Sequence, residues 1–334
     1  MGGTSRQPDA SGTIEVAAGI ITDARGRVLL TQRLPGTHLA GSWEFPGGKL
    51  EAGESVGQAL ARELREELDI QAQEFAPLIS IPWHYPRKTI RLHALRVTAW
   101  RGEPRAREGH ALRWVALRDL DATAMPAADA PVVTALRLPP YYVISADAGT
   151  VGMPVPPPRP DPVHHREEET GAGDALADAL WQLRMPGAER GDLRRTAQAL
   201  LGARPALRER LLVNHDIELA RTLGVGVHLR AAQLRELRER PLPRTAWIGA
   251  SCHAARELEL AAAVGADFAT LSPVLATASH PESTPLGWKR FAELVADARL
   301  PVYALGGVGP RDLGRARAAG AHGVAGIRAF AVPR

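Results

Sequence analysis

From residue 141 onward, short apolar runs alternate with longer stretches rich in Ala, Arg and Leu. The short runs hold the β-branched and aromatic residues that strands favour, and each is followed by enough chain for a helix. Eight such units in succession predict a (β/α)8 TIM barrel, because parallel strands need a crossover between them. We expect the strands at 141–145, 181–184, 211–214, 226–228, 246–251, 268–271, 302–304 and 323–327. A Pro-rich insertion at about 149–174 separates the first two.

Residues 13–138 follow a different pattern, in which several strands accompany one strong helix. The expected strands are 14–22, 28–32, 90–98 and 113–117, and the expected helices are 54–69 and 132–138. A chain of 334 residues is long enough for two domains of about 150 residues each. The sequence therefore predicts an α/β protein with domains at 13–138 and 139–334, after a flexible tail at 1–12.

Composition excludes several classes of protein. The chain is 45% hydrophobic and 23% charged and has no apolar run near the roughly 18 residues of a membrane helix, so we expect a soluble globular protein with no membrane partner. The net charge is only +4, and the 41 basic residues are scattered among 37 acidic ones, so no surface for duplex nucleic acid is expected. The single cysteine, Cys252, excludes a disulfide framework and indicates a reducing, cytoplasmic location.

The clearest chemical signal is a set of three glutamates in the helix expected at 54–69. Because positions i, i+3 and i+4 share one helical face, Glu63, Glu66 and Glu67 project together and repel one another. A divalent cation would neutralise this repulsion, and oxygen ligands favour Mg²⁺ or Mn²⁺. The alternative is a solvated acidic face that binds nothing.

The segment 48–70 resembles the Nudix box, G-x5-E-x7-R-E-U-x-E-E-x-G-U, in which U is an aliphatic residue. Its fixed positions are matched by Gly48, Glu54, Arg62, Glu63, Leu64, Glu66, Glu67 and Ile70. Asp69 departs from the box, because the family has a glycine there that ends the helix. We expect Asp69 to take the left-handed conformation at this position. The resemblance implies a Nudix α/β/α sandwich and a hydrolase acting on phosphoric anhydrides.

The resemblance is to the MutT-type 8-oxo-dGTP pyrophosphohydrolases and covers residues 14–138. It is carried by residues 43–49, 102–104, 108–109 and 125–132. The implied metal ligands are the carboxylates of Glu63, Glu66, Glu67 and Glu108 and the carbonyl of Gly48. In the reaction that the resemblance implies, water attacks a phosphorus atom of a nucleoside triphosphate, with Glu63 as the first choice of general base and Glu108 as the second. Arg62 is expected to pair with Glu54 and hold the loop against the helix.

Three residues match family positions around the nucleoside. The resemblance places Arg33 and Phe45 beside the base and sugar and Asp129 at the purine edge. For His38 a contact with phosphate or ribose is the alternative, and an ordinary surface-loop histidine is the favoured interpretation. Bacterial MutT enzymes have asparagine where this chain has Asp129, and asparagine can both donate and accept hydrogen bonds. An ionised Asp129 can only accept, so it would need a proton to bind O6 of 8-oxoguanine.

The barrel resembles the thiamine phosphate synthase/TenI family over residues 140–330. The resemblance is carried by residues 213–216, 227–229, 248–253, 265–268, 272–274, 304–308 and 320–325. It implies a phosphate site formed by the backbone of Gly306, Gly307, Gly326 and Ile327 after the last two strands. Glycines at barrel corners can also serve the backbone alone.

Charged groups that the family uses for synthesis are missing from the barrel. Pro186 and His280 stand where lysines are expected, and His215 and Gln233 stand where aspartates are expected. We therefore expect the barrel to bind a phosphorylated thiazole, pyrimidine or thiamine ligand without acting as a synthase.

The sequence leaves three functions open. The first is a Mg²⁺-dependent hydrolase that removes oxidised purine nucleotides such as 8-oxo-dGTP from the nucleotide pool and thereby protects DNA replication. The second is hydrolysis of pyrophosphates of the thiamine pathway. The third is a barrel that regulates or docks the hydrolase. Cys252 and His253 invite a nucleophile hypothesis, although we expect buried or loop positions at a strand end.

Overall fold

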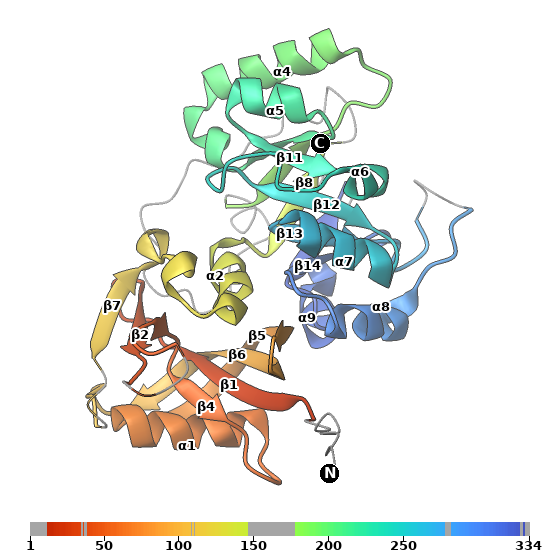
Figure 1. Ribbon diagram of the computed structural model, residues 1–334. Coiled ribbons are helices and arrows are strands. Elements are labelled where there is room, and N and C mark those ends of the chain that lie inside the picture. The colour runs from red at the N-terminus through yellow and green to blue at the C-terminus, as the bar shows by residue number, and fades with distance from the viewer. Residues whose placement is uncertain are drawn as a thin grey trace, which may run out of the picture.

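The computed structural model describes residues 12–34, 36, 39–107, 109, 111–145, 178–277, 282–327 and 330. The predicted insertion at about 149–174 lies outside these residues, as does the predicted tail except for residue 12. The described chain forms two open sheets followed by a closed barrel (Figure 1). The predicted α/β class with a barrel is therefore confirmed, whereas the domain bounds of 13–138 and 139–334 stay a prediction.

Two sheets form the N-terminal part of the fold. The first has the order β4-β1-β6-β5 and consists of Gly47–Lys49 (β4), Ile14–Ile20 (β1), Lys88–Arg101 (β6) and Gln71–Tyr85 (β5). The second has the order β3-β2-β7 and consists of Trp43–Glu44 (β3), Arg27–Gln32 (β2) and Leu112–Ala116 (β7). Strand β1 runs parallel to β6 and antiparallel to β4, so it lies at the centre of the larger sheet.

Two helices cover opposite faces of the larger sheet. Helix α1 spans Val56–Leu68, and helix α2 spans Ala130–Arg137 after short 3-10 turns at 117–119, 122–124 and 127–129. Neighbouring residues of β1 point to opposite faces: Ala17 lies in one buried cluster with α1, and Ala18 lies in another with α2. The sheet is thus enclosed between α1 below and α2 above (Figure 1).

Both ends of α1 are fixed by local chemistry. At its start, Ser55 Oγ accepts from the Gln58 amide at 3.3 Å, and Gln58 Oε1 accepts from the Ser55 amide at 2.9 Å, which forms a capping box. At its end, Asp69 has φ 58° and ψ 29°. The predicted left-handed conformation of Asp69 is therefore confirmed.

Strand β5 was not predicted from the sequence, and β6 is longer than the predicted 90–98. β5 contains Pro77 and Pro82, and its buried and exposed residues do not alternate. Within the described residues it is an edge strand that pairs only with β6, so these prolines need no ladder hydrogen bond on the outer side. The missed strand thus reflects edge-strand chemistry that the alternation pattern does not reveal.

All eight barrel strands lie within two residues of the predicted bounds and form a closed parallel barrel. They are Tyr141–Ile144 (β8), Leu180–Leu183 (β9), Leu211–Asn214 (β10), Gly226–Leu229 (β11), Ile248–Cys252 (β12), Phe268–Leu271 (β13), Val302–Leu305 (β14) and Gly323–Gly326 (β15). The described barrel helices are Arg190–Ala203 (α4), Ile217–Leu223 (α5), Ala231–Glu236 (α6), Ala255–Val264 (α7), Gly287–Ala296 (α8) and Leu313–Ala318 (α9). Short 3-10 turns lie at Pro205–Glu209 and Pro310–Asp312.

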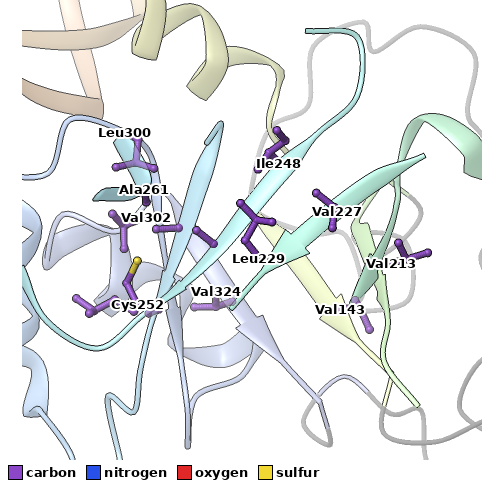
Figure 2. Packing of buried hydrophobic residues seen from close by; sticks show 14 of the residues in the cluster. Val143, Val213, Val227, Leu229, Ile248, Cys252, Ala261, Leu300, Val302 and Val324 are labelled. Atoms are coloured by element: carbon purple, nitrogen blue, oxygen red, sulfur yellow. The ribbon is translucent and has the colours of Figure 1, made fainter. Parts of the chain in front are cut away.

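The barrel has an outer and an inner core. Figure 2 shows outer-core side chains such as Val213, Val227 and Val324, which come from different strands and belong to the cluster that packs against the surrounding helices. The inner core includes Tyr142 and Tyr303, neither of which is exposed. Across the described ranges, no helix combines the length and apolar character needed to cross a membrane.

Asp69 allows a test of the helix end. We expect Asp69→Val to lower the free energy of unfolding by about 1–2 kcal/mol, because a β-branched residue is strained at positive φ. Asp69→Gly relieves that strain and should change stability by less than about 1 kcal/mol. Urea unfolding of both variants measures this difference, and equal stabilities would contradict the assigned conformation.

Candidate active site

Strand β4 and helix α1 meet at two glycines. Gly47 has φ 143°, and a Cβ on it would lie 2.2 Å from the Ala17 carbonyl oxygen of β1, so only glycine fits there. A Cβ on Gly48 would lie 2.3 Å from Oε1 of Glu63. The Glu63 carboxylate therefore lies directly against the strand, in the space that a side chain would occupy.

Arg62 joins the loop before α1 to the helix. Its Nε and Nη2 each donate to one oxygen of Glu54 at 2.9 Å, and its Nη1 donates to Oε1 of Glu63 at 2.8 Å. Nη2 also donates to the Lys49 carbonyl at 3.1 Å. Hydrogen bonding to Arg62 lowers the pKa of Glu54 to about 2. The predicted Arg62–Glu54 pair is confirmed, and Arg62 additionally orients Glu63.

The other two glutamates of α1 differ in their surroundings. The Gly47 amide donates to Oε2 of Glu67 at 3.2 Å, so Glu67 also faces β4. The Glu66 side chain is 55% exposed, and its Oε2 lies 3.6 Å from Nη1 of Arg62. The structure thus brings Glu63 and Glu67 to the two glycines and leaves Glu66 nearer to solvent.

The chemistry of these donors fits a hard divalent cation. Carboxylates and a strand carbonyl are the ligands that Mg²⁺ and Mn²⁺ prefer. Within the described ranges, no three or more His, Cys, Asp or Glu side chains are arranged closely enough to hold a metal ion. Glu63 is bound to Arg62 and Glu67 to a backbone amide, while Glu108 lies outside the described residues. The metal ligands Gly48, Glu63, Glu66, Glu67 and Glu108 stay a prediction.

A second group of predicted residues gathers around β3. Nη1 of Arg33 pairs with Oε2 of Glu44 at 2.5 Å. Asp129 is only 6% exposed, and burial raises the pKa of its carboxyl well above the ordinary range, with the charge of Glu44 raising it further and that of Arg33 opposing the shift. Phe45 follows Glu44 in the sequence and is buried. His38 lies outside the described residues. A raised pKa favours the neutral acid, and a neutral carboxyl group can donate a hydrogen bond.

Sequence reasoning missed two members of this group. Glu44 lies within the segment 43–49 that carries the family resemblance, but the sequence predicts no role for it. Tyr85 ends the unpredicted strand β5, and its hydroxyl accepts from the Ala128 amide at 3.4 Å, one residue before Asp129. Burial raises the pKa of the Tyr85 hydroxyl. Recognising β5 as a strand would have brought its last residue into consideration.

The glycines of the predicted phosphate site have structural reasons of their own. Gly306 and Gly307 follow β14 with φ values of 93° and 69°. A Cβ on Gly306 would lie 2.8 Å from Cα of Pro273, and a Cβ on Gly307 would lie 2.5 Å from the Ala276 carbonyl oxygen. Gly326 ends β15 and is followed by Ile327. Phosphate binding by Gly306, Gly307, Gly326 and Ile327 therefore stays a prediction.

The aspartate nearest to a lost barrel position has other partners. Asp216 caps α5 by accepting from the Leu219 amide at 2.9 Å, and its oxygens accept from Arg190 at 2.6 and 3.1 Å. His280 lies outside the described residues. Asp216 is thus engaged in holding α5 and in an ion pair.

A chain of buried polar groups crosses the barrel interior. The Tyr142 hydroxyl donates to Oε1 of Gln182 at 3.1 Å and lies 3.0 Å from Nδ1 of His228, whose Nε2 lies 2.9 Å from Ser251 Oγ. Burial lowers the pKa of His228 to about 3, so the ring is neutral. Thr270 lies opposite Ser251 on the neighbouring strand β13. Its hydroxyl is buried and has no hydrogen-bond partner in the described part of the chain.

Cys252 and His253 do not form a nucleophilic pair. Cys252 is fully buried in the outer core, and burial raises the pKa of its thiol. His253 is exposed, and its Nδ1 lies 2.8 Å from the Ser272 carbonyl oxygen. The expectation of a buried residue and a loop residue at the strand end is confirmed.

Comparison with known proteins divides the chain in the same order. The family model described as the NUDIX domain matches residues 17–135, and that described as thiamine monophosphate synthase matches residues 164–330. An 8-oxo-dGTP diphosphatase of Escherichia coli is 37% identical over 124 residues, which cover 37% of this chain and 96% of the relative. An 8-oxo-dGTP diphosphatase of Haemophilus influenzae is 46% identical over 120 residues, which cover 36% of this chain and 88% of the relative.

A solved structure also matches the chain. It is described as thiamine phosphate pyrophosphorylase from Pyrococcus furiosus and aligns with a TM-score of 0.42 and 19% identity. The alignment covers 57% of this chain and 86% of that one.

Proposed function

The chain belongs to the Nudix hydrolases in its N-terminal part and to the thiamine monophosphate synthase/TenI family in its C-terminal part, and we propose that its hydrolase acts on oxidised purine nucleoside triphosphates. The carrying observation is Arg62, which binds Glu54 and orients Glu63 against Gly48. The names of the two bacterial relatives support 8-oxo-dGTP as the substrate.

The proposed reaction converts 8-oxo-dGTP and water to 8-oxo-dGMP and pyrophosphate, which removes the oxidised base from the pool used for DNA replication. Glu63 takes the proton of the attacking water, and Arg62 keeps that carboxylate in place. Glu66, Glu67, Glu108 and the Gly48 carbonyl complete the proposed ligand set. Bound Mg²⁺ or Mn²⁺ supplies positive charge to the phosphate oxygens.

Asp129 supplies the proposed base recognition. As a buried neutral acid it offers one donor and one acceptor, which match O6 and N7–H of 8-oxoguanine. Arg33 and Phe45 are proposed to flank the base, with His38 on the phosphate side. This reading makes Asp129 equivalent in hydrogen bonding to the asparagine of bacterial MutT enzymes.

Steady-state kinetics on 8-oxo-dGTP, dGTP and hydroxymethylpyrimidine pyrophosphate test the substrate class. We expect kcat/KM for 8-oxo-dGTP to exceed the other two by at least about tenfold, a difference of about 1.4 kcal/mol in transition-state binding. Glu63→Gln should retain the fold and lose most of kcat. A tenfold preference for the pyrimidine pyrophosphate would instead support hydrolysis in thiamine metabolism.

Gly48→Ala tests the contact between β4 and Glu63. The added Cβ would displace the mobile end of Glu63, so we expect kcat to fall at least about tenfold with little loss of stability. Gly57→Ala is the matched control, because its Cβ would meet Phe75 at an ordinary 3.5 Å. Thermal melts and kcat are measured on both variants, and equal activity of the two would exclude this role for Gly48.

Asp129→Asn tests the protonation state. The pKa of Asp129 is raised, so its donor is present at low pH and is lost as pH rises through that pKa. Asparagine does not titrate, so the ratio of kcat/KM for the wild type over Asp129→Asn should decline with rising pH. We expect Asp129→Asn to keep or improve 8-oxo-dGTP hydrolysis. A ratio that is flat with pH would show that Asp129 does not titrate during base recognition.

For the barrel, we propose binding of a phosphorylated thiazole, pyrimidine or thiamine ligand without synthase activity. The Thr270 hydroxyl, which lacks a hydrogen-bond partner in the described ranges, supports a polar ligand in the interior. The engagement of Asp216 with Arg190 supports the loss of metal chemistry. The glycine-rich turns after β14 and β15 would hold the phosphate. Regulation or docking of the hydrolase by the barrel is the alternative.

Calorimetry on the full chain carrying Glu63→Gln tests this proposal, because that substitution suppresses hydrolysis of added pyrophosphates. Thiazole phosphate and thiamine phosphate are titrated, and the isosteric Thr270→Val should weaken binding by about three- to tenfold. Absence of heat with every ligand would favour a structural barrel. Formation of thiamine phosphate from thiazole phosphate and hydroxymethylpyrimidine pyrophosphate would show that synthase activity is retained.

A further inference from the structure

Helix α2 directly connects the proposed base pocket with the barrel. It begins immediately after Asp129 and ends at Arg137, and it lies between the N-terminal sheets and the barrel (Figure 1). The helix has only eight residues, and so short a helix is marginal by itself. Its position therefore depends on the groups that hold its buried face and its two ends.

The C-terminal end of α2 is held by the floor of the barrel, which we define as Leu138, Pro139, Tyr303 and His322. Leu138 is 5% exposed and belongs to the inner core together with Tyr303. The Tyr303 hydroxyl donates to the Pro139 carbonyl at 2.5 Å, and Nε2 of His322 lies 3.1 Å from the Leu138 carbonyl oxygen. Barrel side chains thus bind the first two carbonyls after the helix.

Tyr303 and His322 are both in the protonation state that these contacts require. Tyr303 is fully buried, and burial raises the pKa of its hydroxyl, which therefore keeps its proton. Burial lowers the pKa of His322 to about 4, so the ring is neutral at physiological pH. Because the partner of Nε2 is a carbonyl oxygen, Nε2 carries the hydrogen and donates it.

A second contact joins the barrel to the sheet beneath α2. Nη1 of Arg91 on β6 donates to the carbonyl of Ala296, the last residue of α8, at 2.6 Å, and Nη2 lies 3.3 Å from Asp297 Oδ1. A cation at the C-terminal end of a helix is favourable. The neighbours of Arg91 on β6, Ile90 and Leu92, lie in the buried cluster that includes α2. Arg91 therefore joins the barrel to the sheet on which α2 packs.

We propose that Tyr303 and His322 are positioning residues for base recognition, acting on Asp129 through α2. This inference rests on the proposed role of Asp129 in reading the base. It gives the barrel a contribution to the hydrolase that needs no chemistry of its own. The residues around Gly48 lie on β4 and α1, so the phosphate chemistry should be insensitive to the barrel floor, whereas base discrimination should depend on it.

The experiment uses the full chain with Tyr303→Phe and His322→Leu combined. Tyr142→Phe is the matched control, because it also removes a buried hydroxyl group inside the barrel. The Tyr142 hydroxyl bonds Gln182 and His228 and not the floor carbonyls. A further variant, His322→Gln in the otherwise wild-type chain, keeps an N–H donor and should behave like the wild type. If the double variant does not fold, Tyr303→Phe alone, which keeps the ring, is compared with Tyr142→Phe.

Two readouts are measured on each variant. Amide hydrogen exchange over residues 127–133 reports the N-terminal end of α2 without any substrate, and we expect it to rise at least about threefold in the double variant only. The preference for 8-oxo-dGTP over dGTP should fall by about three- to tenfold through KM, with kcat retained.

These outcomes separate the inference from the proposed function. Equal exchange in the double variant and Tyr142→Phe overturns the inference, as does raised exchange with an unchanged base preference. If the wild type does not hydrolyse 8-oxo-dGTP, the proposed function fails, and exchange together with KM for the nucleotide that is hydrolysed still decides whether the barrel floor positions Asp129.

Discussion

The bonds of Arg62 hold the entrance of α1 together, and the rest of the site is arranged around them. Arg62 binds Glu54 and Glu63 at the same time, which fixes the loop that enters the helix. The glycines of β4 leave room for Glu63 to lie against the strand. We therefore expect a change of Arg62, of the loop before α1 or of the β4 glycines to displace the Glu63 carboxylate.

Local chemistry made much of this predictable. The Arg62–Glu54 pair and the left-handed Asp69 were implied by the resemblance to the Nudix box, and the eight barrel strands follow from apolar runs that are buried on both faces. β5 was missed because an edge strand tolerates proline and irregular burial. The contact of Tyr303 with Pro139 spans 164 residues of sequence, and no local pattern encodes such a pairing.

The candidate sites were predictable to different degrees. The family resemblance identified the glutamates of α1 and Asp129, but the raised pKa of Asp129 depends on burial and on the charge of Glu44, which only the folded chain reveals. In the barrel, sequence identified the missing charged groups, whereas the structure showed that Asp216 is engaged by Arg190 and that the Thr270 hydroxyl has no hydrogen-bond partner among the described residues. A sequence shows that a charged residue is missing, but it does not show which partners the residues near that position bind instead.

The floor of the barrel also affects whether small molecules can pass from the hydrolase part along the barrel axis. Because all strands are parallel and β8 begins just after Pro140, the amino ends of the strands face the hydrolase, and Leu138 and Tyr303 fill that end of the interior. Within the described residues, these side chains close the barrel axis on that side, so a small molecule in the hydrolase part has no route along the axis to the carboxyl ends of the strands.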